Sequence, residues 1–227
     1  MQKLNPDNLR LSHVLYQVKD LHLSVEKLQD AGFIVEYGTE KSKAYNALIW
    51  FEKGVFVEIY QNSGLPFYVK WMMKIFGYQP VLYRMKKWQS VGEGWCEWSL
   101  ESALNDLNAE KQFFINEKTE YKFHKAKRKD IFGQKLRWEL LMPNNIDFPF
   151  LMSVYVPNPR PKEISHPNGI KAVKNIVVGK EKLDFHLLNQ LLKNQEGLKI
   201  TEGKGLQTVE FLDSELKIEE ILKDFSF

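Results

Sequence analysis

Cysteine is almost absent from this sequence. Cys96 is the single one among 227 residues, so the chain cannot form an intramolecular disulfide. Long apolar runs are also missing: no stretch approaches the length that spans a bilayer, and the first residues, MQKLNPDNLRLSH, lack the apolar core of a signal peptide. We therefore expect a soluble protein without a membrane span, located in the reducing environment of the cytoplasm.

A strong excess of either charge is absent as well. The 32 Lys and Arg residues nearly balance the 29 Asp and Glu residues, and the net charge of +3 is dispersed, so nothing favours a nucleic-acid partner or an anionic membrane. The one basic run, KAKRKD at residues 125–130, is typical of a solvated hairpin. Walker, GxGxxG, HExxH and GxSxG motifs do not occur, which removes motif support for nucleotide binding, metalloprotease and serine hydrolase functions.

What the chain does contain is enough apolar material for a sizeable core, with 44% hydrophobic and 13% aromatic residues. Residues 11–61 begin with an alternating strand, LSHVLYQV. A short helix follows, which Asp20 can cap and Gly32 can end, and then up to three strands. This order predicts a βαβββ unit.

Two strands of this unit carry polar residues in unusual places. His13 shares one face of the first strand with Gln17, because side chains alternate along a strand. In GVFVEIYQ the same alternation places Phe56, Glu58 and Tyr60 on one face. A carboxylate between two aromatic residues on an apolar strand needs a cation or hydrogen-bond donors, which makes Glu58 a candidate functional residue.

Residues 63–91 interrupt the pattern with a predicted helical insert, whose apolar stripe lies between Leu65 and Phe76. Something must cover this stripe. Our first expectation is the protein's own sheet. A homodimer contact and an adaptable hydrophobic lid come next, and a membrane surface comes last.

The pattern of the first unit returns twice after the insert. WCEWSL and AVKNIV align with the first strand, HVLYQV, while RWELL and TVEFL align with the last strand, FVEIY. Glu139 and Glu210 thereby take the place of Glu58. The sequence predicts three related units whose last strands each carry a carboxylate.

These units predict the division of the chain. Residues 1–160 would hold two βαβββ modules, at about 10–62 and 92–142, on either side of the insert. Residues 161–227 would form a shorter βαββ-like C-terminal unit packed on them, after a proline-rich connector.

Several segments together carry a family resemblance. They are HVLYQVKD with its following helix, the strand pair YNALIWF and GVFVEIY, then GWCEWSL, KLRWELLMP and the tetrapeptide HPNG at residues 166–169. In these segments the chain resembles glyoxalase-like domain proteins of the vicinal oxygen chelate superfamily. The resemblance implies an α+β fold in which paired βαβββ modules form curled mixed sheets around a cleft. In metal-dependent members, the first and last strands of each module hold a divalent ion there.

Carried over by position, the metal-binding places fall on His13, Glu58, Trp95 and Glu139. Trp95 cannot ligate a metal, so the resemblance implies a three-ligand site of His13, Glu58 and Glu139, suited to Zn, Mn, Fe or Ni. Glu58 and Glu139 would also be the catalytic carboxylates. Either His166 replaces the missing ligand, or the metal has been lost and the cleft only binds.

Phe56, Tyr60, Trp95 and His166 are the expected substrate-binding residues, since aromatic walls beside Glu58 suit an apolar or aromatic ligand. Purely structural roles stay open as alternatives: His13 could be a hydrogen-bonded histidine of the strand, and HPNG could be a plain turn.

Two functions follow from the resemblance. One is a metal-dependent lyase, isomerase or dioxygenase acting on a small molecule in the cleft between the modules. The alternative is a non-catalytic protein that binds or sequesters a small molecule, as antibiotic-resistance members of the superfamily do.

Overall fold

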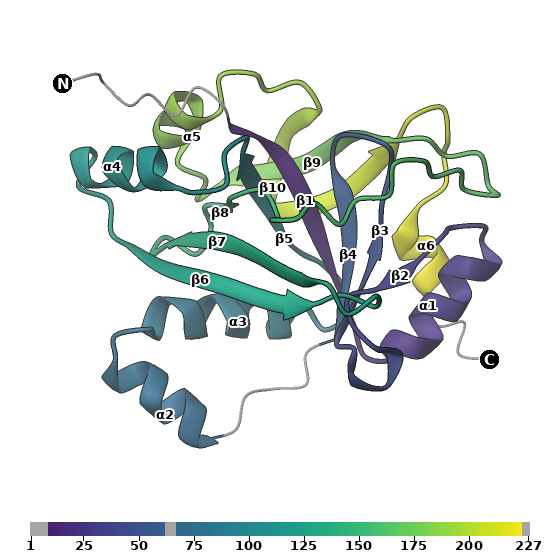
Figure 1. Ribbon diagram of the computed structural model, residues 1–227. Coiled ribbons are helices and arrows are strands. Elements are labelled where there is room, and N and C mark those ends of the chain that lie inside the picture. The colour runs from purple at the N-terminus through teal and green to yellow at the C-terminus, as the bar shows by residue number, and fades with distance from the viewer. Residues whose placement is uncertain (1–8, 62–66, 224–227) are drawn as a thin grey trace.

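The computed structural model describes residues 9–61 and 67–223, which form an α+β fold around a curled eight-stranded sheet (Figure 1). Its first module contains β1 (Leu9–Val18), α1 (Leu21–Asp30), β2 (Glu36–Tyr37), β3 (Asn46–Ile49) and β4 (Phe56–Gln61), with the short 3-10 turn η1 (Lys41–Lys43) before β3. The Asp20 side chain caps α1 by accepting a hydrogen bond from the Leu23 backbone N–H at 3.0 Å. The predicted βαβββ pattern is confirmed.

The second module repeats this order with β5 (Gly94–Ser102), α4 (Asn108–Asn116), β6 (Tyr121–Lys129), β7 (Lys135–Pro143) and β8 (Phe150–Met152). The strand order across the sheet is β2-β3-β4-β1-β5-β8-β7-β6, and the modules meet where β1 pairs antiparallel with β5. In each module the first strand pairs in parallel with the last, β1 with β4 and β5 with β8. Strand β8 is therefore the counterpart of β4.

This topology differs from the predicted alignment of the modules. The strand KLRWELLMP is β7, the counterpart of β3, whereas the last strand of the module is β8, inside the passage we interpreted as a connector. The segment ESALNDLNAEKQ, residues 101–112, predicts a helix that starts directly after the first strand of the module, and the helix lies farther along the chain. Strand β5 runs on to Ser102 and α4 begins only at Asn108, which leaves Leu104 exposed.

The insert forms two helices, α2 (Phe67–Ile75) and α3 (Gln79–Val91). Arg84 of α3 is buried and bonds Glu97 of β5, Leu82 of α3 is buried beside the space between the two helices, and α3 contacts β5 and β1. Figure 1 shows α2 farther from the sheet than α3. The sheet does not cover the apolar stripe of α2, whose described residues Trp71, Met72, Ile75 and Phe76 are exposed; Leu65 lies outside the described residues.

The C-terminal unit consists of β9 (Val173–Glu181), α5 (Phe185–Leu191), β10 (Leu198–Phe211) and α6 (Ile218–Leu222). The two strands predicted after the helix are one continuous element. Leu198–Thr201 are in register with Ile176–Gly179, and Gly205–Phe211 run back along β9 to Val173. Gly179 permits this close pairing, because a Cβ there would lie 2.3 Å from the backbone carbon of Gly203.

The two faces of the large sheet have different roles. One face, here the core face, carries Val14, Tyr16, Val57 and Ile59 and packs into the main hydrophobic core, which includes residues of α1, β9 and β10. The opposite face, here the cleft face, carries His13, Leu15, Glu58 and Tyr60. The predicted alternation along β1 and β4 is therefore confirmed. None of the described helices is both long and apolar enough to cross a membrane.

Candidate functional site

A cavity of about 220 Å³ lies on the cleft face, between the two modules. We call it the cleft cavity. Module one supplies most of its polar end, Arg128 of β6 and Tyr155 after β8 complete that end, and module two supplies most of its apolar wall. The lining residues are His13, Leu15, Tyr45, Asn46, Glu58, Tyr60, Trp88, Arg128, Trp138, Leu140, Met142, Phe150, Met152 and Tyr155.

His13 is held in one orientation by stacking and by two hydroxyl groups. Its ring stacks on Phe56 with centroids 4.6 Å apart, and only 4% of the residue is exposed. The Oγ atoms of Ser99 and Ser12 lie 2.7 and 3.0 Å from Nδ1. Burial lowers the pKa of His13 to about 3, so the imidazole is neutral near pH 7.

Glu58 lies on β4, the parallel neighbour of β1, and faces His13. Its Oε2 lies 3.6 Å from His13 Nε2, and its Oε1 accepts a hydrogen bond from Asn46 Nδ2 at 2.8 Å. Burial raises the pKa of the Glu58 carboxyl, and this effect exceeds the opposing effects of the Asn46 hydrogen bond and the Arg128 charge. The pair thus combines a histidine that resists gaining a proton with a carboxyl group that resists losing one.

Tyrosine hydroxyls complete the polar end. Burial raises the pKa of Tyr60 to about 12 and raises that of Tyr155 further, with the Glu58 charge adding to both shifts. Both phenols remain protonated near pH 7 and can donate a hydrogen bond to a ligand oxygen. Arg128, at 5.9 Å from the Tyr155 ring, is the cation of this end.

The module-two side of the cavity is apolar. Phe150 and Met152 of β8 face the cavity, with Trp138, Leu140 and Met142 of β7 beside them. Phe150 packs edge-on to His13 at 5.4 Å between ring centroids. Cys96 packs with Leu15 and Phe150, and burial raises the pKa of its thiol, which is typical of an inert, structural cysteine.

A carboxylate of module two, Glu97 on β5, is already paired. It lies opposite Leu15 in the register of β1 and β5, and its Oε2 accepts hydrogen bonds from Arg84 at 2.5 Å and from Trp88 Nε1 at 3.1 Å. Arg84 also donates to the carbonyls of Pro143, Asn145 and Phe148. Both charged side chains are at most 2% exposed, so the insert helix α3 neutralises this carboxylate from inside the protein.

The structure brings together only some of the residues that the sequence predicted. His13, Glu58 and Tyr60 line the cleft cavity, and Phe56 supports His13 from a neighbouring hollow. Trp95 does not reach the cavity: it lies in the main core, and its Nε1 donates to Glu219 Oε2 on α6.

Glu139 lies on the opposite face of β7 from Trp138 and Leu140. Its carboxylate accepts a hydrogen bond from the Leu107 backbone N–H at 3.0 Å and pairs with Lys125 at 3.5 Å. The predicted register of Glu139 with Glu58 is therefore wrong. Strand β7 is the counterpart of β3 and not of β4, and the alternation of side chains along β7 turns Glu139 away from the cleft cavity.

His166 binds the backbone of module one. Its Nδ1 accepts a hydrogen bond from Ile34 N–H at 2.9 Å, which leaves the proton on Nε2, 3.0 Å from the Trp50 carbonyl oxygen. The next residues of the tetrapeptide hold the end of α1, where Asn168 Nδ2 donates to the Ala31 carbonyl. The geometry favours a structural histidine in a turn over a ligand in the cleft.

The donor set of the cleft does not fit the divalent ion that the superfamily resemblance implies. The first and last strands of module one provide His13 and Glu58. On β5 and β8 the residues at or beside the cleft are Glu97, already bonded to Arg84, and Cys96, Ser99, Phe150 and Met152. Within residues 9–61 and 67–223, no group of three or more His, Cys, Asp or Glu side chains could hold a metal ion.

Sequence reasoning missed Asn46, Arg128 and Tyr155. Asn46 is detectable in retrospect, since it is a polar residue at the start of a buried strand directly before ALIW. Arg128 and Tyr155 reach the cavity through the pairing of β6, β7 and β8, which no local pattern reveals.

Comparison with known proteins agrees with this architecture. The family described as "Glyoxalase-like domain" matches residues 11–192. The chain belongs to this family. No curated protein matches it in sequence.

The solved structures that resemble the fold include two that match most of this chain. A hypothetical protein from Staphylococcus aureus has a TM-score of 0.60 and 14% identity, and the match covers 91% of this chain and 93% of that one. The Mn(II)-bound glyoxalase from Novosphingobium aromaticivorans has a TM-score of 0.53 and 11% identity, with 95% and 69% coverage. At such identities the likeness to these neighbours shows a shared fold alone.

Proposed function

We propose that this glyoxalase-like protein binds a small molecule in the cleft cavity, and that the ligand combines an aromatic or branched apolar body with hydrogen-bonding oxygens. The observation that carries the proposal is the division of the cavity into a polar end at His13, Glu58 and Asn46 and an apolar wall at Leu140, Phe150 and Met152. An apolar cavity of about 150 Å³ is enough for benzene, so about 220 Å³ accommodates a substituted ring.

The polar end defines which oxygens fit. Tyr60 and Tyr155 offer O–H donors, and Arg128 adds a positive charge, so a carbonyl, phenolate or carboxylate oxygen finds donors there. The neutral imidazole of His13 accepts or donates only one hydrogen bond at Nε2. A ligand with two neighbouring oxygens would use both groups.

The proposal is tested by screening small aromatic acids, phenols and hydroxy-ketones for a thermal shift of the protein, followed by calorimetric titration of the ligands found. Leu140→Trp fills the apolar wall and is expected to abolish binding. Glu58→Gln keeps the size but changes the hydrogen-bonding pattern, and we expect a loss of about tenfold in affinity.

Arg137→Trp is the matched control, because it adds the same ring to β7 on the side away from the cleft cavity. It is expected to leave the affinity unchanged. Equal loss of binding in Leu140→Trp and Arg137→Trp, with both variants folded, would contradict binding in the cleft cavity.

A second candidate function is proton transfer on the bound molecule. The observation that favours it is the 3.6 Å approach of His13 Nε2 and Glu58 Oε2, together with burial that shifts the two pKa values in opposite directions. Glu58 would move a proton to or from a ligand carbon next to a carbonyl, while Tyr60 and Tyr155 hold the oxygen.

Incubation of a bound ligand in D₂O separates this function from binding alone. Deuterium incorporation that depends on Glu58 and disappears in Glu58→Gln is the expected result for proton transfer. Saturable binding without incorporation would assign the cleft to binding only.

A further inference from the structure

The α2–α3 insert carries a concentrated apolar surface, which we call the insert face. Five large side chains of the α2 helical segment are between 48% and 66% exposed: Tyr68, Trp71, Met72, Ile75 and Phe76. They lie within nine residues of chain, whereas exposed apolar side chains are usually scattered singly over a surface. Trp and Tyr among them are the residues typical of the boundary between lipid and water.

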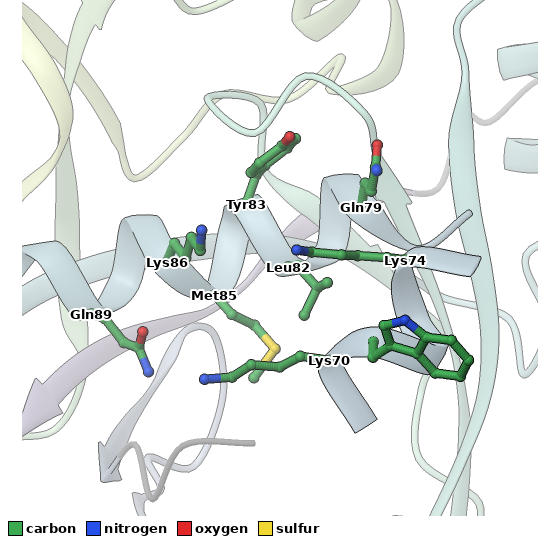
Figure 2. A pocket seen from close by; sticks show the side chains of 9 residues that line it. Lys70, Lys74, Gln79, Leu82, Tyr83, Met85, Lys86 and Gln89 are labelled. Carbon is green, nitrogen blue, oxygen red and sulfur yellow. The ribbon is translucent and has the colours of Figure 1, made fainter. Parts of the chain in front are cut away.

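Positive charge surrounds these apolar groups. Figure 2 shows Lys70 and Lys74 of α2 and Lys86 of α3 lining the hollow between the two helices, beside Leu82 and Met85. No Asp or Glu occurs anywhere in residues 59–92. The local charge is therefore positive even though the whole chain is nearly balanced.

Strand β6, beside the insert, adds further basic side chains to this surface. A second hollow of about 630 Å³ lies between the insert and the sheet, lined by Tyr68, Met72 and Phe76 on one side and by Lys122 and His124 of β6 on the other. Lys122 Nζ lies 5.8 Å from the Tyr78 ring, which joins the insert to the basic strand. Strand β6, residues 121–129, also lacks acidic residues.

Charge complementarity decides which partner fits. A second copy of this chain would bring Lys70, Lys74 and Lys86 against their own equivalents, and like charges opposed across an interface are destabilising. A surface of anionic lipid headgroups offers the opposite charge to the lysines and an apolar boundary layer to the aromatic side chains. Amphipathic helices with Lys on one side and Trp or Phe on the other bind such surfaces in the interface plane.

We propose that the insert face binds the surface of an anionic lipid bilayer, with Trp71, Ile75 and Phe76 entering the headgroup layer and Lys70, Lys74 and Lys86 contacting the lipid phosphates. Binding is peripheral, and no described helix is required to cross the membrane. The cleft cavity is a separate site on the face of the sheet, so this interaction does not depend on a ligand there.

The test is co-sedimentation of the full-length protein with large vesicles of phosphatidylcholine, with and without 30% phosphatidylserine, at about 0.05 M and 0.5 M NaCl. We expect saturable binding only to the anionic vesicles and release at high salt. Lys70→Glu/Lys74→Glu should lose about 25-fold in partitioning, since each Lys near such a surface is worth about fivefold. Trp71→Ser/Phe76→Ser should lose more than about tenfold.

Matched controls remove the same groups elsewhere. Phe132→Ser changes the most exposed Phe of the described chain, in the turn between β6 and β7, and Lys171→Glu/Lys193→Glu reverses two exposed lysines of the C-terminal unit. Both are expected to bind like the wild type. Equal loss in the controls, equal binding to neutral vesicles, or no binding of the wild type would overturn the proposal.

Hydrogen exchange provides a readout that needs no variant. Anionic vesicles should slow amide exchange in residues 67–91 and leave α5 unchanged, since α5 lies at the top and α2 at the bottom of the view in Figure 1, far from each other. Unchanged exchange in residues 67–91 would contradict the proposal. Sedimentation showing a dimer that Trp71→Ser abolishes would instead assign the insert face to self-association and overturn the lipid interaction.

Discussion

His13 Nε2 and Glu58 Oε2 lie 3.6 Å apart on two parallel strands, β1 and β4, that also pair through their backbones. Burial favours the neutral form of each group, by lowering the pKa of the histidine to about 3 and raising that of the carboxyl. Burial therefore disfavours the charged form of both side chains at the polar end of the cleft cavity. This character suits recognition of a small, partly apolar molecule.

The pH dependence of stability should reveal the buried histidine. The folded pKa of His13 is below its unfolded value of 6.5, so the unfolded chain takes up the proton first, and stability falls as the pH drops from 6.5 toward 3. At pH 5 this group costs about 2 kcal/mol relative to pH 7.5. His13→Gln should remove that loss, measured as the free energy of urea unfolding at both pH values.

His186→Gln is the control, because His186 is exposed on α5. It should keep the wild-type difference between pH 7.5 and pH 5. A His13→Gln variant with the full wild-type loss of stability in acid would show that His13 is not buried in its neutral form.

The Arg84–Glu97 pair should be essential for stability. Arg84→Met leaves the Glu97 carboxylate buried and without its cation, and we expect a loss of about 3–5 kcal/mol in the free energy of unfolding. The double variant Arg84→Met/Glu97→Met should be more stable than the single one, because no unpaired charge remains.

Arg10→Met provides the comparison with a surface pair. Arg10 also bonds a carboxylate, that of Glu101, but its side chain is 61% exposed, so its loss should cost less than about 1 kcal/mol. Equal destabilisation by Arg10→Met and Arg84→Met would contradict the distinction between the two pairs.

His166 should act on stability and leave ligand binding unchanged. His166→Phe deprives the Ile34 N–H and the Trp50 carbonyl of their partners, for which we expect a loss of about 2–4 kcal/mol in unfolding free energy. Calorimetric titration of a cleft ligand should give the wild-type affinity. Lost affinity at wild-type stability would restore His166 as a ligand-binding residue.

Gly32 should be required for stability, because the HPNG turn packs too closely against it to leave room for a side chain. Its φ is +80°, and a Cβ there would lie 2.8 Å from the backbone nitrogen of Asn168, so Gly32→Ala should cost about 2–3 kcal/mol. Gly54 has a φ of +77° but open space around it, and Gly54→Ala should cost only about 1–2 kcal/mol. Thermal unfolding of both variants measures the difference, and equal costs would show that Asn168 yields to the added methyl group.

The first module could be predicted from the sequence because its signals are local. The Asp20 cap and the alternation in β1 and β4 act within a few residues, and they place His13, Glu58 and Tyr60 on one face without knowledge of the rest of the chain.

The second module could not be predicted to the same depth, because its signals depend on pairing. Strand β8 has three residues and lies among prolines, so it has no detectable period of its own. Without β8, the carboxylate of Glu139 in β7 was matched with Glu58, and the side-chain alternation of β7 then put it on the wrong face.

The positive surface at the insert could not be predicted from the sequence totals either. A balanced total for the chain gave no reason to expect an anionic surface as a partner, whereas the fold places the acid-free segment 59–92 beside the basic strand β6. Whether a protein attracts an anionic surface depends on where its charged residues lie in space, and the total charge of the chain does not contain that information.

The most direct test of binding in the cleft is methyl NMR of the protein with ¹³C-labelled methionine. Met152 lines the cleft cavity, while Met72 and Met73 line the hollow beneath α2. Titration with a ligand from the thermal-shift screen should move the Met152 methyl signal saturably, with the dissociation constant found by calorimetry, and leave Met72 and Met73 in place. A ligand that shifts Met72 and Met73 but not Met152 would contradict the proposed function.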